Sequence, residues 1–205
     1  MKPRTPCRAC GALLLSALAG AAHADVIWSS GPGHNDHVYR PVSVATGITW
    51  GAAEAAAVAL GGTLATPASA EENDFVFTLA SQHASAWFTD TAGHARGPWL
   101  GGFQAAAAVE PAGGWQWVNG EGDFAYTAWA PGQPNNSGGA ESRLQFYGST
   151  SAFSAAWNDA SATAQMLGYV VEWSTAIPEP GTPALVLFGL ALSGLAAARA
   201  ARVAR

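Results

Sequence analysis

Residues 126–136 read Tyr-Thr-Ala-Trp-Ala-Pro-Gly-Gln-Pro-Asn-Asn, and residues 157–159 read Trp-Asn-Asp. The two stretches and a glutamate between them carry five oxygen donors in loops between apolar segments: Gln133, Asn135, Glu141, Asn158 and Asp159. Each of these residue types is common in ordinary turns. As a group they offer the carboxylate and amide oxygens that a hard cation such as calcium prefers. The combination therefore indicates a cation site.

The residues upstream predict two helices. Residues 50–60 are rich in alanine, and Gly61 and Gly62 follow as a C-terminal cap. Ser69 and Glu72 have the spacing of a capping box, which begins a second helix. The remaining chain consists of short aromatic stretches separated by Gly, Pro and Asn, which is typical of strands. Two helices followed by strands indicate an α+β fold rather than a βαβ repeat.

Further local expectations concern residues 28–94. Residues 28–35, rich in Gly, Ser and Pro, are expected to form a loop, and residues 38–44 a strand that Gly47 ends. The apolar side of the second helix is expected to carry Phe75, Phe77 and Leu79. His34, Asp36 and His37 could clip a metal. With no further ligands evident nearby, a solvated loop is the favoured interpretation. His83 and His94 are interpreted as surface or satisfied histidines.

These motifs resemble the C-type lectin-like domain, and the resemblance covers nearly all of residues 38–173. Residues 60–65 look like the family's Leu-Gly-Gly-x-Leu-Ala segment, and residues 99–102 like its Trp-Ile-Gly-Leu strand, with Gly102 at the usual leucine. Residues 126–136 are similar to its long proline-containing loop, and residues 157–159 match its Trp-Asn-Asp motif. The four motifs occur in the family's order.

The resemblance implies one calcium ion that binds both the domain and two neighbouring sugar hydroxyls. Its ligands would be the five oxygen donors named above, and Pro134 would be a cis proline that aims its neighbours inward. Sugar hydroxyls would contact four of the same residues, Gln133, Asn135, Glu141 and Asn158. No group is placed to act on the sugar, so the expected activity is binding without turnover.

Departures from the family pattern lower the expected affinity. Mannose-type sites read Glu-Pro-Asn and galactose-type sites Gln-Pro-Asp, whereas this chain reads Gln-Pro-Asn at residues 133–135. Only Glu141 and Asp159 remain as carboxylates, where either family form has three. Fewer charges weaken a calcium site, so a dissociation constant on the order of 10⁻⁴–10⁻³ M is expected. Asn136 and Ser142 replace aspartates of an auxiliary site, which is expected to be lost.

The family's disulfides are also missing. By motif spacing, Ala57 and Val171 stand where one bridge joins the first helix to the last strand, and Arg143 and Ala162 where another staples the loops. A lost bridge removes about 2–4 kcal/mol. The apolar first pair can pack instead, but nothing evident in the sequence compensates for the second. We therefore expect mobile loops that calcium partly orders.

Composition and charge exclude other classes of protein. Of 205 residues, 49% are hydrophobic and 11% charged, which suits a folded core. Residues 25–177, the predicted domain, contain three arginines against thirteen acidic residues, a formal charge of −10. Such a domain repels phosphates, so nucleic-acid binding is excluded.

The N-terminus has the layout of a signal peptide over residues 1–24. Basic residues in the first eight positions precede an apolar run over residues 11–22 and a small-x-small site at residues 22–24. Both cysteines, Cys7 and Cys10, fall in this segment, so the exported domain would contain none. Signal peptidase would remove it. A buried first helix is the alternative, but it leaves the basic residues unexplained.

The C-terminus, residues 178–205, combines Pro178-Glu179-Pro180, an apolar run and an arginine-rich tail. The order resembles the PEP-CTERM sorting signal, which implies a transient transmembrane helix, processing by an exosortase, and delivery to the cell surface or matrix. A plain membrane anchor is the alternative.

Three functions remain to be compared. The first is a surface lectin that binds carbohydrate, such as exopolysaccharide, through calcium. The second is a calcium-independent scaffold of the same fold that recognises protein or structures the matrix. An enzyme comes third, because serine and histidine occur in no recognisable catalytic arrangement.

Overall fold

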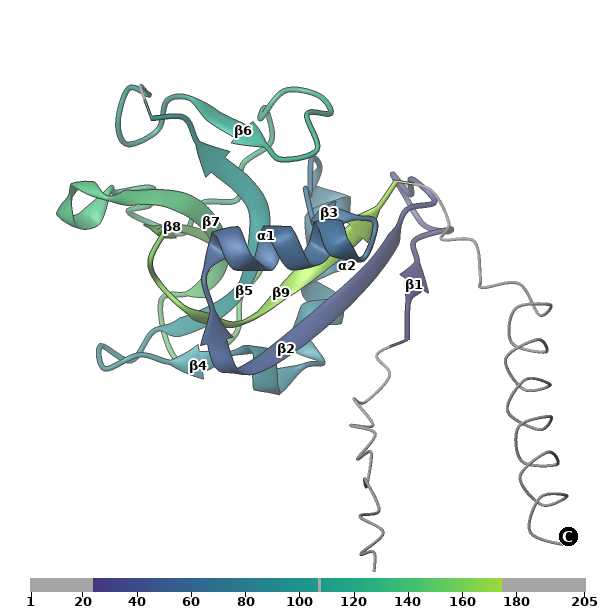
Figure 1. Cartoon of the computed structure of the whole chain (residues 1–205), viewed down its shortest axis with the longest axis horizontal. Coiled ribbons are helices and arrows are strands. Elements are labelled where there is room, and N and C mark those ends of the chain that lie inside the picture. Colours follow the sequence, from purple (N-terminus) through teal and green to yellow (C-terminus); the bar gives the residue numbers. More distant parts are fainter. Residues whose placement is uncertain (1–23, 107, 175–205) are drawn as a thin grey trace, which may run out of the picture.

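The structure, a computed structural model, describes residues 24–106 and 108–174 (Figure 1). It combines α-helices and short 3-10 helices (η) with β-strands, as an α+β fold requires. In chain order the elements are β1 (Val26–Ile27), β2 (Val38–Ile48), α1 (Trp50–Ala59), β3 (Thr63–Leu64), α2 (Ala70–Ser81), η1 (Ala84–Ala86), β4 (Phe88–Thr89), β5 (Ala95–Gln104), β6 (Trp115–Trp117), η2 (Ser137–Gly139), β7 (Glu141–Gly148), β8 (Trp157–Ser161) and β9 (Met166–Trp173).

The last strand joins the two halves of the sheet. The strand order is β1-β2-β9-β5-β7-β8, with β3 beside β9 and both β4 and β6 beside β5. Strand β9 runs antiparallel to β2, and it meets β5 in parallel where Trp99 pairs with Tyr169. The β5–β7–β8 half carries the loops with the oxygen donors. In Figure 1 these loops lie at the left, away from β1 and the end of β9.

Helix α1 forms where the alanine-rich stretch predicted it. The Thr49 side chain accepts a hydrogen bond from the Ala52 amide, and the helix ends at Leu60 before Gly61, whose φ is +82°. The small side chain of Ala57 is fully buried, in the same apolar cluster as Val171. Apolar packing therefore occupies the position of the first missing disulfide.

Helix α2 begins at its predicted cap but buries a different side. Ser69 accepts from the Glu72 amide, whereas the Glu72 carboxylate accepts from the Ala68 amide rather than from Ser69. The side that faces the core carries Glu72, Asn73, Val76 and Ala80. The predicted apolar residues, Phe75, Phe77 and Leu79, are only partly buried. Residues two apart cannot share one helix face, because neighbours on a face are three or four apart.

Strand β2 does not end at Gly47 as expected. It continues to Ile48, and its register with β9 shifts between Ser43 and Ile48. Gly47 has a φ of +77°, so it accommodates an irregularity inside the strand instead of terminating it.

The glycine that replaces the family leucine is required by packing. A Cβ at Gly102 would come within 2.7 Å of Cδ2 of Leu144, and one at Gly101 within 2.6 Å of the Leu64 carbonyl. A larger residue at either position would push the β5 backbone away from its neighbours.

The predicted signal peptide, the Pro178-Glu179-Pro180 motif and the C-terminal apolar run lie outside the described residues. Within residues 24–106 and 108–174, no helix combines the length and apolarity needed to cross a membrane.

Candidate functional site

The proline-containing loop is attached to strand β8 by its backbone. Trp129 bridges to Trp157, the Trp157 amide donates to the Ala128 carbonyl at 2.8 Å, and the Ala130 amide donates to the Trp157 carbonyl at 2.9 Å. The Gln133–Pro134 peptide bond is cis. The loop therefore leaves and returns beside the strand that carries Asn158 and Asp159.

The Asp159 carboxylate anchors the proline-containing loop to strand β8. Its side chain is fully buried, and its carboxylate accepts hydrogen bonds from the Asn135 amide at 3.0 and 3.1 Å and from the Asn136 amide at 2.7 Å. Asn136 itself lies in the left-handed region, with a φ of +46°. Asp159 thus brings the Gln133–Asn135 segment to the β8 strand.

Two further predicted ligands meet at one amide. The Ser137 amide donates to Oδ1 of Asn135 and to Oε2 of Glu141, in each case at 2.9 Å. The Glu141 amide in turn donates to Oδ1 of Asn136 at 3.0 Å. Asn135 and Glu141, six residues apart in the chain, therefore present neighbouring oxygens.

The other two predicted residues each retain an oxygen without a hydrogen bond. Gln133 Oε1 is buried and has no partner among the described residues. Asn158 is buried and donates through Nδ2 to the Asp159 carbonyl, while no described residue donates to its Oδ1. Both amides can therefore still offer an oxygen to a cation.

Electrostatics at this site favour a positive charge. Burial raises the pKa of Glu141, and the nearby Asp159 carboxylate raises it further, against the lowering effect of the Ser137 amide. A cation between the two carboxylates would remove that repulsion. The set of donors is all oxygen, which suits calcium.

Arg143, at the position of the second missing disulfide, is accommodated by aromatic packing. Its guanidinium lies 4.9 Å from the centre of the Trp50 ring and 6.0 Å from that of Phe103. Ala162, the other half of the missing bridge, is exposed in the turn after β8. The Arg143 stack joins the start of β7 to helix α1, a contact that the sequence did not suggest.

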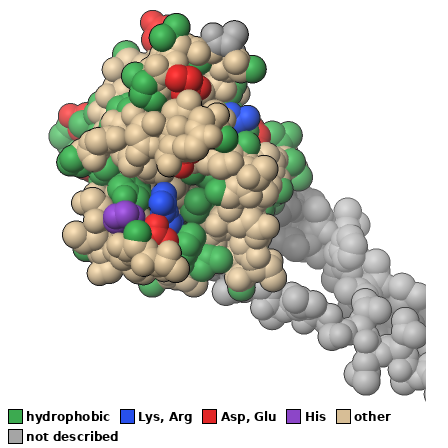
Figure 2. All heavy atoms as spheres, turned by 90° about the vertical axis from the view of Figure 1, so that its left-hand side faces the viewer, with side chains coloured by type: hydrophobic (Ala, Val, Ile, Leu, Met, Phe, Trp, Pro, Cys, Tyr) green, Lys and Arg blue, Asp and Glu red, His purple; other side chains and the backbone are tan. Residues whose placement is uncertain are grey.

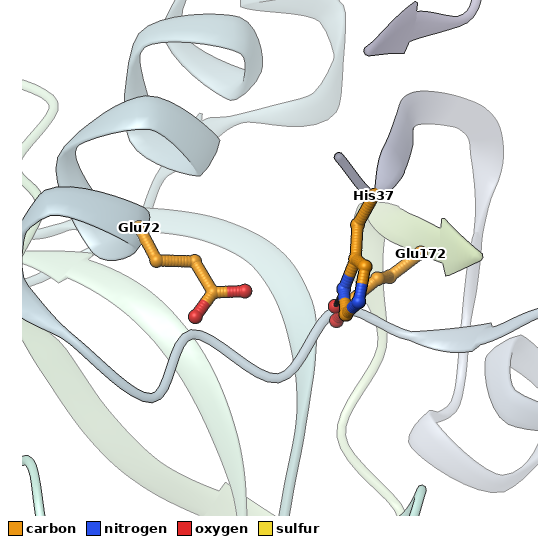
Figure 3. A group of neighbouring side chains, drawn as sticks. All are labelled: His37, Glu72 and Glu172. Atoms are coloured by element: carbon orange, nitrogen blue, oxygen red, sulfur yellow. Dashed lines mark hydrogen bonds and ion pairs between the residues drawn. The ribbon is translucent and has the colours of Figure 1, made fainter. Parts of the chain in front are cut away.

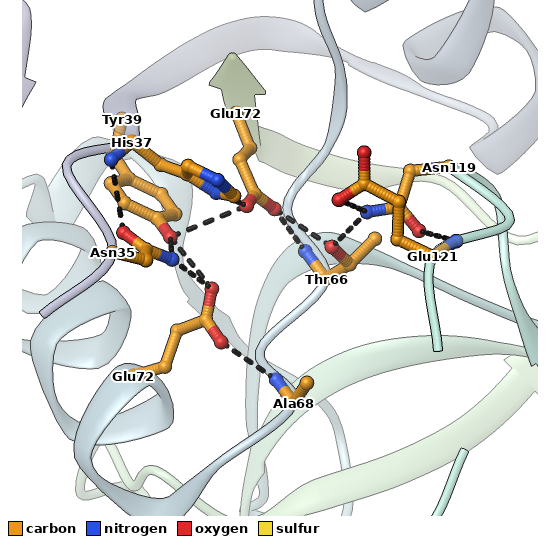
Figure 4. A network of polar contacts seen from close by, with 9 residues as sticks. All are labelled: Asn35, His37, Tyr39, Thr66, Ala68, Glu72, Asn119, Glu121 and Glu172. Atoms are coloured by element: carbon orange, nitrogen blue, oxygen red, sulfur yellow. Dashed lines mark hydrogen bonds and ion pairs between the residues drawn. The ribbon is translucent and has the colours of Figure 1, made fainter. Parts of the chain in front are cut away.

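A second polar cluster, missed by the sequence analysis, lies near the end of β9 (Figure 4). His37 Nδ1 is 2.6 Å from Glu172 Oε1, and the other Glu172 oxygen accepts from the amide of Thr66 at 2.7 Å and its hydroxyl at 2.9 Å. The Tyr39 hydroxyl donates to Glu72 Oε1 at 2.6 Å and lies 3.3 Å from Glu172 Oε1. The favoured solvated-loop interpretation of residues 34–37 is therefore wrong for His37.

Figure 3 shows His37 and Glu172 side by side, with the Glu72 carboxylate directed toward them. One ligand atom from each of the three residues lies within 4.8 Å of the others, a geometry that could hold a cation or share a proton. The hydrogen bond to Glu172 raises the pKa of His37, and burial raises the pKa of Glu72. The glutamates lie 35 and 135 residues from His37 in the chain, so no local pattern could have predicted the cluster.

Comparisons with known proteins identify a sorting motif and a shared fold. Residues 176–202 match the PEP-CTERM protein-sorting motif. The C-type lectin CEL-I from Cucumaria echinata superposes with a TM-score of 0.53 and 29% identity over 69% of this chain and 92% of that one. An EPNH mutant of CEL-I gives a TM-score of 0.52 and 30% identity over 67% of this chain and 89% of that one.

A fish relative and a further structure extend the comparison. Ladderlectin from Oncorhynchus mykiss is 35% identical over 98 residues, 48% of this chain but only 45% of ladderlectin, so the match spans less than half of that relative. A calcium-independent type II antifreeze protein shares the fold at 24% identity and a TM-score of 0.50, covering 74% of this chain and 97% of that one.

The described residues have the C-type lectin-like fold that the sequence motifs predicted. The chain belongs to the C-type lectin-like family and ends in a PEP-CTERM sorting motif.

Proposed function

We propose that the chain is an exported surface or matrix protein whose C-type lectin-like domain binds carbohydrate through one weakly held calcium ion. Five residues would hold the ion: Gln133, Asn135, Glu141, Asn158 and Asp159. Calcium would supply the coordination positions that take two sugar hydroxyls. The protein's part is to fix the oxygens in place and to bind the same hydroxyls.

The observation that carries the proposal is the Ser137 amide shared by two predicted ligands. It holds Asn135 Oδ1 and Glu141 Oε2 on the same side of the loop, each at 2.9 Å. The partnerless oxygen of Gln133 adds a third donor on the same loop. An ordinary turn needs no such convergence of acceptors, whereas a calcium site does.

Calorimetric titration of calcium tests the proposal. We expect one saturable site, and we expect Glu141→Gln to weaken it because a carboxylate is lost while the shape of the side chain is kept. Glu71→Gln, on an exposed part of helix α2, is the matched control and should bind as the wild type does. Absence of binding at millimolar calcium would contradict the proposal.

One observation favours a second candidate, a calcium-independent scaffold that recognises protein or structures the matrix. Asp159 already receives three hydrogen bonds from the loop backbone, so the loop has an anchor without any metal. The fold is shared with a calcium-independent antifreeze protein. A glycan array probed with and without calcium separates the two candidates, since only the lectin gains signal on adding calcium.

Export is the remaining part of the proposal. The PEP-CTERM motif at residues 176–202 supports processing by an exosortase, after removal of residues 1–24 by signal peptidase. Residues 25–177 would then be the binding domain and residues 178–205 the sorting segment, membrane-inserted only before processing. Mass spectrometry of the protein from its host's surface fraction checks both cleavages; an intact C-terminus there would favour a plain anchor.

A further inference from the structure

Arg143 is the one arginine among the described residues that has no carboxylate partner. Arg40 is paired with Asp25, and Arg96 with Asp90, where Nε and Oδ2 are 2.8 Å apart. Figure 2 shows basic side chains in small patches, with acidic side chains beside them, on a face that is mostly uncharged. An unpaired guanidinium in a domain of strong negative charge is unusual, because acidic partners are abundant.

The Arg143 side chain is fixed but keeps most of its donors. Nη1 donates to the carbonyl and the hydroxyl of Ser142 at 2.7 and 3.0 Å. Nε and Nη2 bond to no described residue, although a guanidinium carries five N–H donors in a planar fork. The stack on Trp50 and Phe103 holds the plane of that fork. Burial lowers the pKa of Arg143, but an arginine remains charged at any physiological pH.

Arg143 is one of the residues that line a pocket beside the calcium loop. The pocket has a volume of about 240 Å³ and is also lined by Asn136 and Glu141 from the loop and by Gln104 at the end of β5. Gln104 is 4% exposed, and its Oε1 accepts no hydrogen bond from the described residues. That oxygen is itself buried, so Arg143 is the group through which the pocket can bind an anion.

We propose that this pocket is a second subsite, in which Arg143 binds the carboxylate of an acidic sugar unit next to the unit in the calcium site. The fork of a guanidinium matches the two oxygens of a carboxylate. The inference rests on the proposed function, because Glu141 belongs to both sites.

Two carboxylates of the pocket oppose an anion. Glu141 is half-buried, whereas Glu110 is exposed and screened by water. A calcium ion at the main site would neutralise Glu141, so the second subsite would accept an acidic sugar only when calcium is present. Binding of calcium and binding of an acidic sugar are then coupled through Glu141.

The test uses the full chain in non-ionic detergent with millimolar calcium. The probes are tetragalacturonate and tetramannuronate, each paired with its methyl ester, which removes the charge and keeps the ring. We expect at least one acid to bind about tenfold more tightly than its ester. Arg143→Gln should bring this ratio close to one, and Arg143→Lys should give an intermediate ratio because lysine keeps the charge without the fork. Arg96→Gln, whose arginine is already paired with Asp90, should keep the wild-type ratio.

The outcomes separate this inference from the function on which it rests. Equal calcium-dependent binding of acid and ester, or an unchanged ratio in Arg143→Gln, would overturn the second subsite alone. Absence of both calcium binding and binding of any probe would overturn the proposed function together with the subsite. The calcium affinity of each variant, measured in parallel, shows whether a changed ratio reflects a damaged loop.

Discussion

Asp159 and Glu172 are both buried carboxylates, but they hold the two ends of the domain with different partners. Asp159 receives backbone amides of the loop. Glu172 receives side-chain groups of His37 and Thr66, along with one amide. A backbone anchor tolerates changes in the loop's side chains, whereas a side-chain anchor depends on particular residues and on their protonation. The end of the domain that carries the proposed calcium site can therefore change the side chains of its loop without unfolding.

The largest effect is expected at the side-chain anchor. Glu172→Ala would leave the amide and hydroxyl of Thr66 and the His37 ring without their buried acceptor. We expect the free energy of unfolding to fall by about 3–5 kcal/mol, as when one partner of a buried charged pair is removed. Urea denaturation measures it. Glu71→Ala, an exposed glutamate, should change stability by less than about 0.5 kcal/mol, and equal effects of the two variants would contradict the proposed role of Glu172.

The backbone anchor should cost less to remove. Asp159→Ala leaves the Asn135 and Asn136 amides without an acceptor, but this loop borders solvent and water can replace part of the loss. We expect a decrease of about 2 kcal/mol in the free energy of unfolding, together with loss of calcium binding. Retained calcium affinity in this variant would show that the loop is shaped by other contacts.

Only the side-chain anchor should respond to pH near neutrality. The hydrogen bond to Glu172 raises the pKa of His37 above 6.5. Protonated His37 therefore contributes fully to stability below pH 6.5, and this contribution is lost as the pH rises through the pKa of His37 in the folded protein. Burial raises the pKa of Glu72 above 4.5, so ionisation of Glu72 also costs stability as pH rises. We expect a larger free energy of unfolding at pH 6 than at pH 8.5. His37→Gln should lose much of that difference, and an unchanged profile would contradict the assignment.

The smallest effect on global stability, but the most local one, is expected from calcium. Hydrogen exchange of the Asn135, Asn136 and Ser137 amides should slow on adding calcium, because the ion would hold the acceptors that these amides already use. Amides of helix α2 serve as the internal reference. Equal exchange with and without calcium across residues 133–160 would favour the calcium-independent scaffold.

Much of the fold could be predicted because its signals are local. The cap at Ser69, the glycines after α1 and the Trp157-Asn158-Asp159 motif all lie where short-range patterns put them. The errors have physical causes. Gly47 was expected to end a strand, but a glycine with positive φ can also shift the register within one.

The two polar sites also differ in how far the sequence could predict them. The five proposed ligands fall in two short segments, and the structure brings Asn135, Glu141 and Asp159 together through backbone amides. The cluster of His37 with Glu72 and Glu172 could not be predicted, because it forms only when β2 pairs with β9 and α2 packs against β2. The stack of Arg143 on Trp50 was missed for the same reason.

The position of β9 also has a mechanical consequence. Its last residue, Trp173, leads toward the sorting segment, while the calcium loop lies on the far side of the sheet (Figure 1). If the chain is held at its C-terminus and a polysaccharide pulls on the loop, the load passes along β9. The hydrogen bonds of antiparallel strands lie perpendicular to that direction. The β2–β9 pairs from Val38–Trp173 to Ser43–Gly168 would therefore bear the load together, in shear, instead of opening one after another.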